Sequence, residues 1–416
     1  MRHCLCAILL LALAASAQDR TEKWREDLRF LTEAYSAKGN TVDVQRGIST
    51  RGQKDFEKLY PNFRRDIGAL ESEIPKLSDA EIVLRLMKIV GGANVAHNVV
   101  QTPLEFGFFP RLPLTFTWYS DGLAITAASE EYAAAMGARV VKIGPKTPET
   151  LTAELAPYIP HENDVWLRQG AADLLRIRAI LEHAGVADRD GTVLLTLQKP
   201  DAAEAYTLTV KTGDPRAKLI SASDALHIPA ALFRSHPNQP YWHQYLPDSG
   251  TLFIQYNACR NDPQLPFRDF AGKVLADADG NTVKRVVIDL RFNGGGDSRI
   301  IRPLKDGLTA RLSKTGRIFV LIGPRTFSSA MDNAVELRTA LHAKLAGEPT
   351  GGKPSSYGEV KVVELPNSKL KVQFTSKFFG SHKDSEAGEL APDIVVRRTL
   401  ADALSGRDPV LEAVLH

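Results

Sequence analysis

Cysteine is scarce and neither sign of charge dominates in this chain of 416 residues. Of the 3 cysteines, Cys4 and Cys6 lie in an N-terminal segment that we predict to be removed, so the processed chain can form no intramolecular disulfide. We expect the remaining Cys259 to be a small buried side chain. The 52 basic and 49 acidic residues give a net charge of +3, which offers no reason to expect a nucleic acid or an anionic membrane as partner.

Sequence signatures of bound metals and nucleotides are also missing. No group of histidine, cysteine and acidic residues has the spacing of a metal site. The run Gly294, Gly295 and Gly296 is not followed by the lysine–serine or lysine–threonine pair that ends a phosphate-binding P-loop. The sequence therefore predicts neither a metal ion nor another cofactor.

The first 17 residues have the pattern of a secretory signal peptide. Residues 2–3 form a short basic start, residues 4–15 are apolar but too few to span a bilayer, and the small residues 15–17 fit cleavage after Ala17. We therefore expect a periplasmic or secreted protein without a stable membrane anchor. The alternative is a cytoplasmic protein with an apolar N-terminus.

Hydrophobic periodicity divides the remaining chain into four predicted regions. Residues 18–103 have a helical pattern, whereas residues 104–215 contain short strands separated by turn signals. Residues 216–250 are rich in proline and polar turns, as in a linker. In residues 251–416 strands alternate with helices, which predicts a largely parallel sheet with helices packed against it, ending in a β-hairpin and a closing helix.

A histidine follows the last predicted helix of the first region. Ser78 and Glu81 have the spacing of a capping box at the start of this helix, and His97 lies in the turn after it. A side chain with a near-neutral pKa suits proton transfer, so His97 is a candidate general base. The alternative is a histidine with only a structural role in the turn.

Two serines stand where a predicted strand gives way to a helix. Residues 317–323 form an apolar, β-branched run, and Ser328 and Ser329 precede apolar residues at helical spacing. A hydroxyl at such a turn lies near the unpaired N–H groups of a helix N-terminus, which can stabilise an oxyanion. Ser328 is therefore a candidate nucleophile, and a side chain that merely caps the helix is the alternative for either serine.

Two glycine-rich segments accompany these serines. The apolar run 284–290 leads into RFNGGGD, whose glycines can present backbone N–H groups to an oxyanion, and Lys353 lies further along in GEPTGGKP. The order D-L-R-x-N-G-G-G, T-x-S-S-A and G-E-P-T-G-G-K resembles that of the tail-specific (C-terminal-processing) serine peptidases. The resemblance covers roughly residues 251–416.

This resemblance implies both a fold and a site. The fold implied is an α/β crotonase/ClpP-like spiral protease core with an N-terminal helical region and an inserted PDZ-like α+β domain, which in the family captures the substrate's C-terminal segment. The site implied is a catalytic dyad of Ser328 and Lys353. Its oxyanion hole would use the backbone of Gly295 or Gly296 and of Ser329.

The general base that serves Ser328 is left open by the sequence. A lysine acts as a base only when neutral, and its ordinary pKa near 10.4 then requires desolvation or a neighbouring positive charge. Lys353 is followed by Pro354 where the family usually has glycine. In tricorn-type relatives a histidine from the region of His97 is the base, and in that case Lys353 would bind substrate or be structural.

The remaining charged residues near these motifs are expected to support the site. Asp289 and Arg291 are predicted to fix the glycine loop by hydrogen bonds and an ion pair, and Asn293 to orient it. Glu359 and Glu364 are near Lys353 in sequence, where each is either a group that orients the base or simply a solvated side chain.

The sequence and its resemblance thus predict a secreted serine endopeptidase that hydrolyses peptide bonds through an acyl-enzyme on Ser328. The resemblance favours Lys353 as the general base, with His97 as the alternative, and implies an oxyanion hole in the glycine-rich loop. The partner of this enzyme would be a protein or peptide substrate. The alternative, from another class, is a catalytically inactive peptide- or lipid-binding relative of the same fold. The sequence does not determine the oligomeric state.

Overall fold

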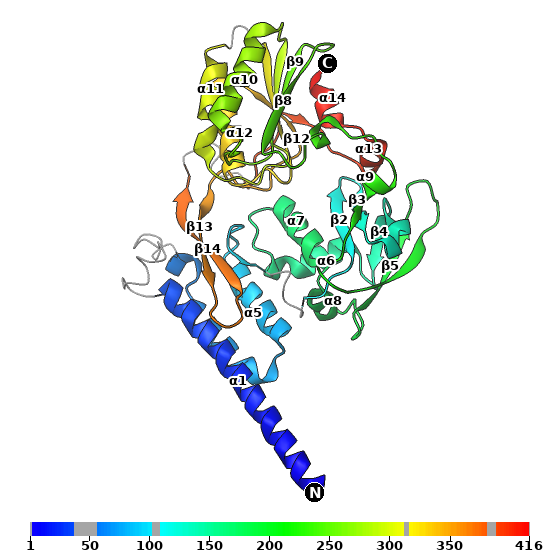
Figure 1. Ribbon diagram of the computed structural model, residues 1–416, viewed down its shortest axis with the longest axis vertical. Helices are drawn as coiled ribbons and strands as arrows, with labels where there is room; N and C mark the ends of the chain where they lie inside the picture. Colours follow the sequence, from blue (N-terminus) through cyan, green and yellow to red (C-terminus); the bar gives the residue numbers. More distant parts are fainter. Residues whose placement is uncertain (1, 37–55, 102–108, 312–315, 381–387, 416) are drawn as a thin grey trace.

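The computed structural model describes residues 2–36, 56–101, 109–311, 316–380 and 388–415 (Figure 1). The domain boundary predicted between residues 103 and 104 lies outside these ranges. Within them, no helix combines the length and the apolar character needed to cross a membrane.

A six-stranded sheet forms the centre of the C-terminal half. All neighbouring pairs from β9 to β15 are parallel, and only the edge strand β8 runs antiparallel to its neighbour. The predicted alternation of strands and helices is therefore confirmed. In spatial order the strands are β15 (Ile394–Val395), β12 (Lys344–Gly347), β11 (Arg317–Ile322), β10 (Arg285–Asp289), β9 (Thr251–Tyr256) and β8 (Tyr241–Leu246).

Helices cover both faces of this sheet because successive side chains of a strand point to opposite sides. Ile254 and Ile288 belong to the apolar layer shared with α10 (Phe267–Gly280), α11 (Arg302–Thr309) and α12 (Ser329–Leu341). Phe253 and Val287, one position earlier in each strand, pack on the other side with α14 (Pro409–Leu415). These strands are buried on both faces, which explains their continuous apolar sequence.

The segment 216–250 is not simply a linker, as its proline content suggested. Its last part forms β8, whose residues Tyr241–Leu246 pair along the whole of β9. Earlier in the segment, β7 (Ile220–Ser221) pairs with β3 (Gly122–Ala128) of the preceding domain. The prolines lie outside these paired strands, where they cost no ladder hydrogen bond. The sheet of the C-terminal domain therefore starts before Thr251.

The middle domain contains an antiparallel sheet and a group of helices. Its strands pair in sequence order from β2 to β6, and α7 (Asp164–Leu174) packs against β2. The other elements are β2 (Leu114–Tyr119), β4 (Arg139–Ile143), β5 (Thr192–Gln198), β6 (Tyr206–Lys211), α6 (Pro148–Leu155) and α8 (Arg178–His183).

The predicted hairpin after Lys353 is confirmed, but its strands belong to a separate small sheet and not to the six-stranded sheet. Strands β13 (Ser356–Glu364) and β14 (Lys371–Phe379) form a three-stranded sheet with β1 (Val99–Gln101). This sheet lies beside the N-terminal helices (Figure 1), and the rings of Tyr35 and Phe374 meet at 4.1 Å between centroids. The hairpin thus joins the N-terminal region to the C-terminal domain.

Helix α5 (Asp79–Gly91) of the N-terminal region begins at the predicted capping box. Ser78 accepts a hydrogen bond from the Glu81 backbone N–H, and the Glu81 carboxylate accepts one from the Ser78 N–H, so the predicted capping box is confirmed. The helices of this region are α1 (Arg2–Ser36), α4 (Phe63–Glu73) and α5 (Asp79–Gly91).

Candidate active site

Ser328 occupies the turn between β11 and α12. Its backbone has φ 53° and ψ −130°, a conformation that non-glycine residues rarely adopt. Its side chain makes no capping hydrogen bond to the helix, unlike that of an ordinary N-cap serine. A strained turn thus holds a half-buried hydroxyl group at the N-terminus of a 13-residue helix.

The glycine loop lies directly against this serine. A Cβ atom on Gly295 would come within 2.7 Å of Ser328 Cβ, so only glycine fits at this position. Asn293 orients the loop as predicted, because its Oδ1 accepts the Gly295 N–H at 2.9 Å and its Nδ2 donates to the Tyr256 carbonyl at 2.9 Å. The side chain of Ser329 closes the contact by donating to the Gly296 carbonyl at 2.6 Å.

Asp289 and Arg291 fix the start of this loop, as predicted. Both carboxylate oxygens of Asp289 accept hydrogen bonds from the Arg291 guanidinium. The same guanidinium donates to both oxygens of Asp408, each at 2.7 Å. All three side chains are buried, so the loop is tied by a fully paired ionic cluster to the start of α14.

His97 and Ser328 line one cavity of about 850 Å³. Gly294, Gly296 and Ser329 contribute to its wall, so the glycine loop and the helix N-terminus open into the same space. His97 reaches it from the loop before β1, and its imidazole ring lies 4.4 Å from the ring of Phe327, the residue before Ser328. The fold therefore brings the histidine and the serine to one cavity.

The imidazole of His97 is buried and neutral at physiological pH. Desolvation lowers its pKa from 6.5 to about 4, opposed only in part by the backbone of Tyr357. Neither ring nitrogen makes a hydrogen bond of good geometry with a described residue. A neutral imidazole with free nitrogen atoms can accept a proton from a nearby hydroxyl.

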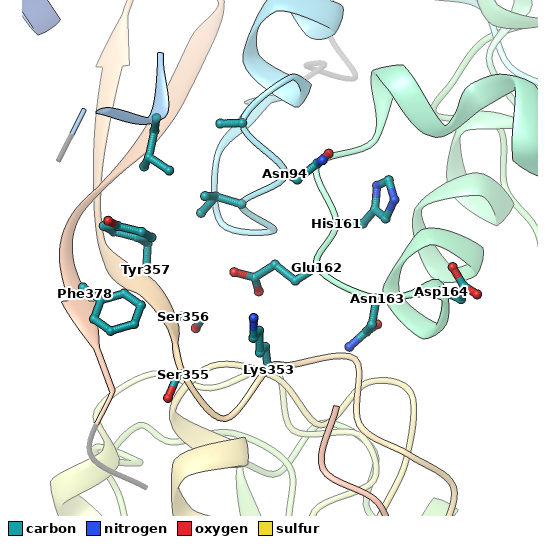
Figure 2. A pocket seen from close by; sticks show the side chains of 13 residues that line it. Asn94, His161, Glu162, Asn163, Asp164, Lys353, Ser355, Ser356, Tyr357 and Phe378 are labelled. Atoms are coloured by element: carbon teal, nitrogen blue, oxygen red, sulfur yellow. The ribbon is translucent and has the colours of Figure 1, made fainter. Parts of the chain in front are cut away.

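Lys353 lines a different cavity, of about 430 Å³. In Figure 2 its ammonium points towards the carboxylate of Glu162, which comes from the middle domain. Burial raises the pKa of Glu162 from 4.5 to about 7, and the positive charge of Lys353 partly counteracts that increase. The lysine and the histidine that the sequence offered as bases thus lie in separate cavities.

The two glutamates near Lys353 in sequence, Glu359 and Glu364, lie in different places in the structure. Glu359 lines the cavity of His97 and Ser328, and its backbone has φ 53°, an uncommon value within a strand. Glu364 lies at the far end of β13, where its exposed carboxylate is 3.9 Å from the ammonium of Lys371. Only Glu359 is therefore placed where it can face a substrate.

Sequence reasoning missed the contribution of the middle domain to this region. Glu162 faces Lys353, and the indole of Trp166 stacks on Phe327 with 4.0 Å between ring centroids and an interplanar angle of 9°. Asn163 is the N-cap of α7 and accepts the Trp166 backbone N–H at 2.8 Å. Because asparagine is a preferred N-cap residue, the start of this helix could have been predicted from the sequence. No local pattern indicates that the helix following it docks on the serine turn.

Two other sequence expectations concern cysteine and metals. Cys259 is buried, as predicted, and its Sγ lies 3.5 Å from the side-chain oxygens of Asn293 and Asn333. Across the part of the chain that the structure describes, no three histidine, cysteine or acidic side chains are grouped as metal ligands.

Comparison with known proteins finds a family match over one segment of the chain. Residues 299–396, which include Ser328 and Lys353, match the protein family described as Peptidase family S41. No match to a curated protein was found. The structure of mature CPAF complexed with lactacystin has 14% sequence identity and a TM-score of 0.63, covering 94% of this chain and 97% of that one.

Two further solved structures extend this comparison. A crystal structure of mature CPAF has 15% identity and a TM-score of 0.62, covering 94% of this chain and 96% of that one. The photosystem II D1 C-terminal processing protease has 14% identity, covers 84% of this chain and 94% of its own, and has a TM-score of 0.37.

The match to Peptidase family S41 indicates a serine-type peptidase, and the CPAF structures share its mixed α/β fold. More particularly, residues 299–396 match Peptidase family S41, in agreement with the resemblance of the sequence to the tail-specific proteases.

Proposed function

We propose that this protein is an exported endopeptidase that cleaves protein or peptide substrates through an acyl-enzyme on Ser328. The observation that carries the proposal is the strained turn of Ser328, with a hydroxyl group released from helix capping and a neutral imidazole in the same cavity. Such strain is commonly retained where the surrounding structure serves a function. The S41 family match supports the same reaction class.

We infer that His97, rather than Lys353, is the general base. His97 opens into the cavity of Ser328 and is neutral, so it can take the Oγ proton as the oxygen attacks the substrate carbonyl. The imidazolium then gives this proton to the leaving amine, and water later hydrolyses the ester by the reverse proton movements. Lys353 points towards Glu162 in the neighbouring cavity and does not line the cavity of Ser328, so it is not placed to take the Oγ proton.

Backbone N–H groups beside Ser328 supply the proposed oxyanion hole. The N–H of Ser329 is at the first position of α12, where a helix leaves its N–H groups unpaired. The Gly295 N–H already donates to Asn293, which leaves Gly296, on the cavity wall, as the second donor. Both would stabilise the negative charge that develops on the carbonyl oxygen during attack.

The remaining parts of the proposal concern the domains and the cell compartment. We infer a crotonase/ClpP-like arrangement for the C-terminal domain and a PDZ-like substrate-binding role for the middle domain, supported by its antiparallel sheet with helices. Export after cleavage at Ala17 rests on the basic start and short apolar run of residues 2–15.

The test is covalent labelling with a fluorophosphonate probe and cleavage of an unfolded protein substrate, using residues 18–416. We expect an adduct on Ser328 and cleavage that Ser328→Ala abolishes. His97→Asn should lower kcat by roughly 10³-fold or more, whereas Lys353→Met should retain activity within about tenfold. The reverse order would assign the base to Lys353.

A protein without either activity would support the alternative of an inactive binding protein. Circular dichroism of each variant establishes that any loss is not due to unfolding. Absence of both label and cleavage at neutral and alkaline pH, in a folded protein, would overturn the proposed function in favour of a peptide- or lipid-binding role.

A further inference from the structure

Three rings from three parts of the chain contact one another in succession next to Ser328, with Phe327 stacked on Trp166 and tilted by 34° against His97. Phe327 lies between the imidazole of His97, at 4.4 Å, and the indole of Trp166, at 4.0 Å. His97 belongs to the N-terminal region, Phe327 to the C-terminal domain and Trp166 to helix α7 of the middle domain. The proposed base is therefore connected through one ring to a domain that supplies no residue to its own cavity.

The indole of Trp166 is fixed firmly enough to support such a stack. Asn163, at the start of α7, donates from Nδ2 to the carbonyls of Thr350, Gly351 and Gly388, at 3.3, 3.2 and 2.9 Å. The indole also packs closely on Gly351, where an added Cβ would come within 2.6 Å of the ring. The start of α7 is thus attached to the C-terminal domain on both sides of Lys353 in sequence.

Aromatic packing, together with the backbone of Tyr357, orients the imidazole of His97. Its nitrogen atoms make no hydrogen bond of good geometry with described residues, so no acidic side chain fixes the direction of the ring. Phe327 is buried and contacts the imidazole, while the indole of Trp166 stacks on the ring of Phe327 and restrains it. If the indole were removed, Phe327 would gain room to move away and the imidazole would lose its support.

We propose that Trp166 is a positioning residue for His97 and acts through the ring of Phe327. This inference rests on the proposed function, in which His97 receives the proton of Ser328. It assigns to the middle domain a role in building the catalytic site, in addition to any role in binding substrate.

Charged groups on other elements also line the cavity that His97 faces. Asp297 and Arg299 come from the glycine loop and the turn after it, Asp332 from α12, and Glu359 and Lys377 from the hairpin. None of them is altered by a substitution at Trp166. A change in the titration of His97 in a Trp166 variant therefore reports a change in the packing and hydration of the imidazole.

The experiment measures the titration of His97 by NMR of histidine-labelled protein in a Ser328→Ala background, with a His97→Asn variant to assign the signal. Trp166→Ala should raise the pKa of His97 from about 4 towards 6.5, because water reaches the ring. With Ser328 intact, kcat should fall by about 10- to 100-fold, with a smaller change in KM. Trp166→Phe keeps an aromatic ring against Phe327, so the pKa of His97 and the value of kcat should both stay close to those of the unsubstituted protein.

A matched control is Trp118→Ala, on strand β2 of the same domain, where the side chain packs under Arg168. This variant removes an indole that contacts α7 through Arg168 but leaves the rings of Trp166, Phe327 and His97 in place. The titration of His97 should therefore move much less than in Trp166→Ala. If Trp166→Ala does not fold, Trp166→Leu provides the same test with most of the apolar volume retained.

The proposal would be overturned if Trp166→Ala and Trp118→Ala left the titration of His97 and the value of kcat equally unchanged. The NMR measurement does not require activity. A shifted titration in a protein that cleaves no substrate would therefore contradict the proposed function while supporting the contact between Trp166 and the His97 environment.

Discussion

Gly295 lies so close to Ser328 that a methyl group on Gly295 would stand within 2.7 Å of the serine Cβ. Gly295 also has φ +104°, a backbone conformation that other residues rarely adopt. Its N–H is held by Asn293, so three constraints fix one residue against the proposed nucleophile. The glycine loop therefore positions Ser328 in addition to exposing N–H groups.

Gly295→Ala is expected to displace Ser328 and to lower kcat by at least about 100-fold, because small misplacements of a nucleophile are costly. The strained backbone should also reduce the free energy of unfolding by about 1–3 kcal/mol. Urea unfolding and cleavage assays measure the two effects. Gly294→Ala is the control for stability, since a Cβ there meets nothing within 4 Å, and a similar loss in both variants would refute the steric argument.

The acid limb of the pH dependence of kcat/KM should lie near pH 4, well below the value for an exposed histidine. Burial lowers the pKa of His97 to about 4, so the imidazole stays neutral and able to accept a proton until the pH falls to that value. Initial rates from about pH 3.5 to pH 9, with circular dichroism at each pH, provide the test. A limb near pH 6.5, or activity that appears only in alkali, would contradict the assignment of His97 as base.

The same shift makes stability depend on pH. The unfolded chain binds a proton at His97 below its ordinary pKa of 6.5, whereas the folded chain does so only near pH 4. The free energy of unfolding should therefore decrease as the pH falls from 6.5 to 4. His97→Phe should reduce this decrease, as measured by urea unfolding across that range, and an identical pH profile in the variant would show that another group is responsible.

Glu162 is expected to destabilise the fold at alkaline pH. Its pKa is raised from 4.5 to about 7 mainly by burial, so the folded chain holds the proton more tightly and loses stability as the pH rises through this window. Glu162→Gln should thus gain about 1 kcal/mol of unfolding free energy at about pH 8 and little at about pH 4. Lys353→Met should increase the loss of unfolding free energy at alkaline pH, because the ammonium stabilises the charged carboxylate of Glu162.

The buried cluster of Asp289, Arg291 and Asp408 should be essential for stability. Asp408→Asn leaves a buried guanidinium without one of its two charged partners, which costs about 3 kcal/mol or more in unfolding free energy. Asp279→Asn removes a partner of Arg311 at an exposed site and should cost less than about 1 kcal/mol. Equal effects in urea unfolding would mean that the cluster contributes no more than a surface ion pair.

Several elements could be predicted because local sequence suffices to define them. The apolar strands around Val287 and Leu321, the capping box of Ser78 and the turn of Ser328 follow from residue type and spacing within a few positions. The role of Asn293 also followed from its place before the glycines. The prediction of a linker over residues 216–250 was wrong at β8. This segment pairs with β9 in spite of the prolines near it.

The sequence by itself determined the alternation of strands and helices, the glycine loop and the serine turn, and with them the peptidase class. Only the tertiary structure decided that His97 shares a cavity with Ser328, that Lys353 faces Glu162, and that Trp166 supports Phe327. The physical reason is that these contacts join residues far apart in the chain. They depend on how three regions of the chain pack together, and no local periodicity or spacing encodes that packing.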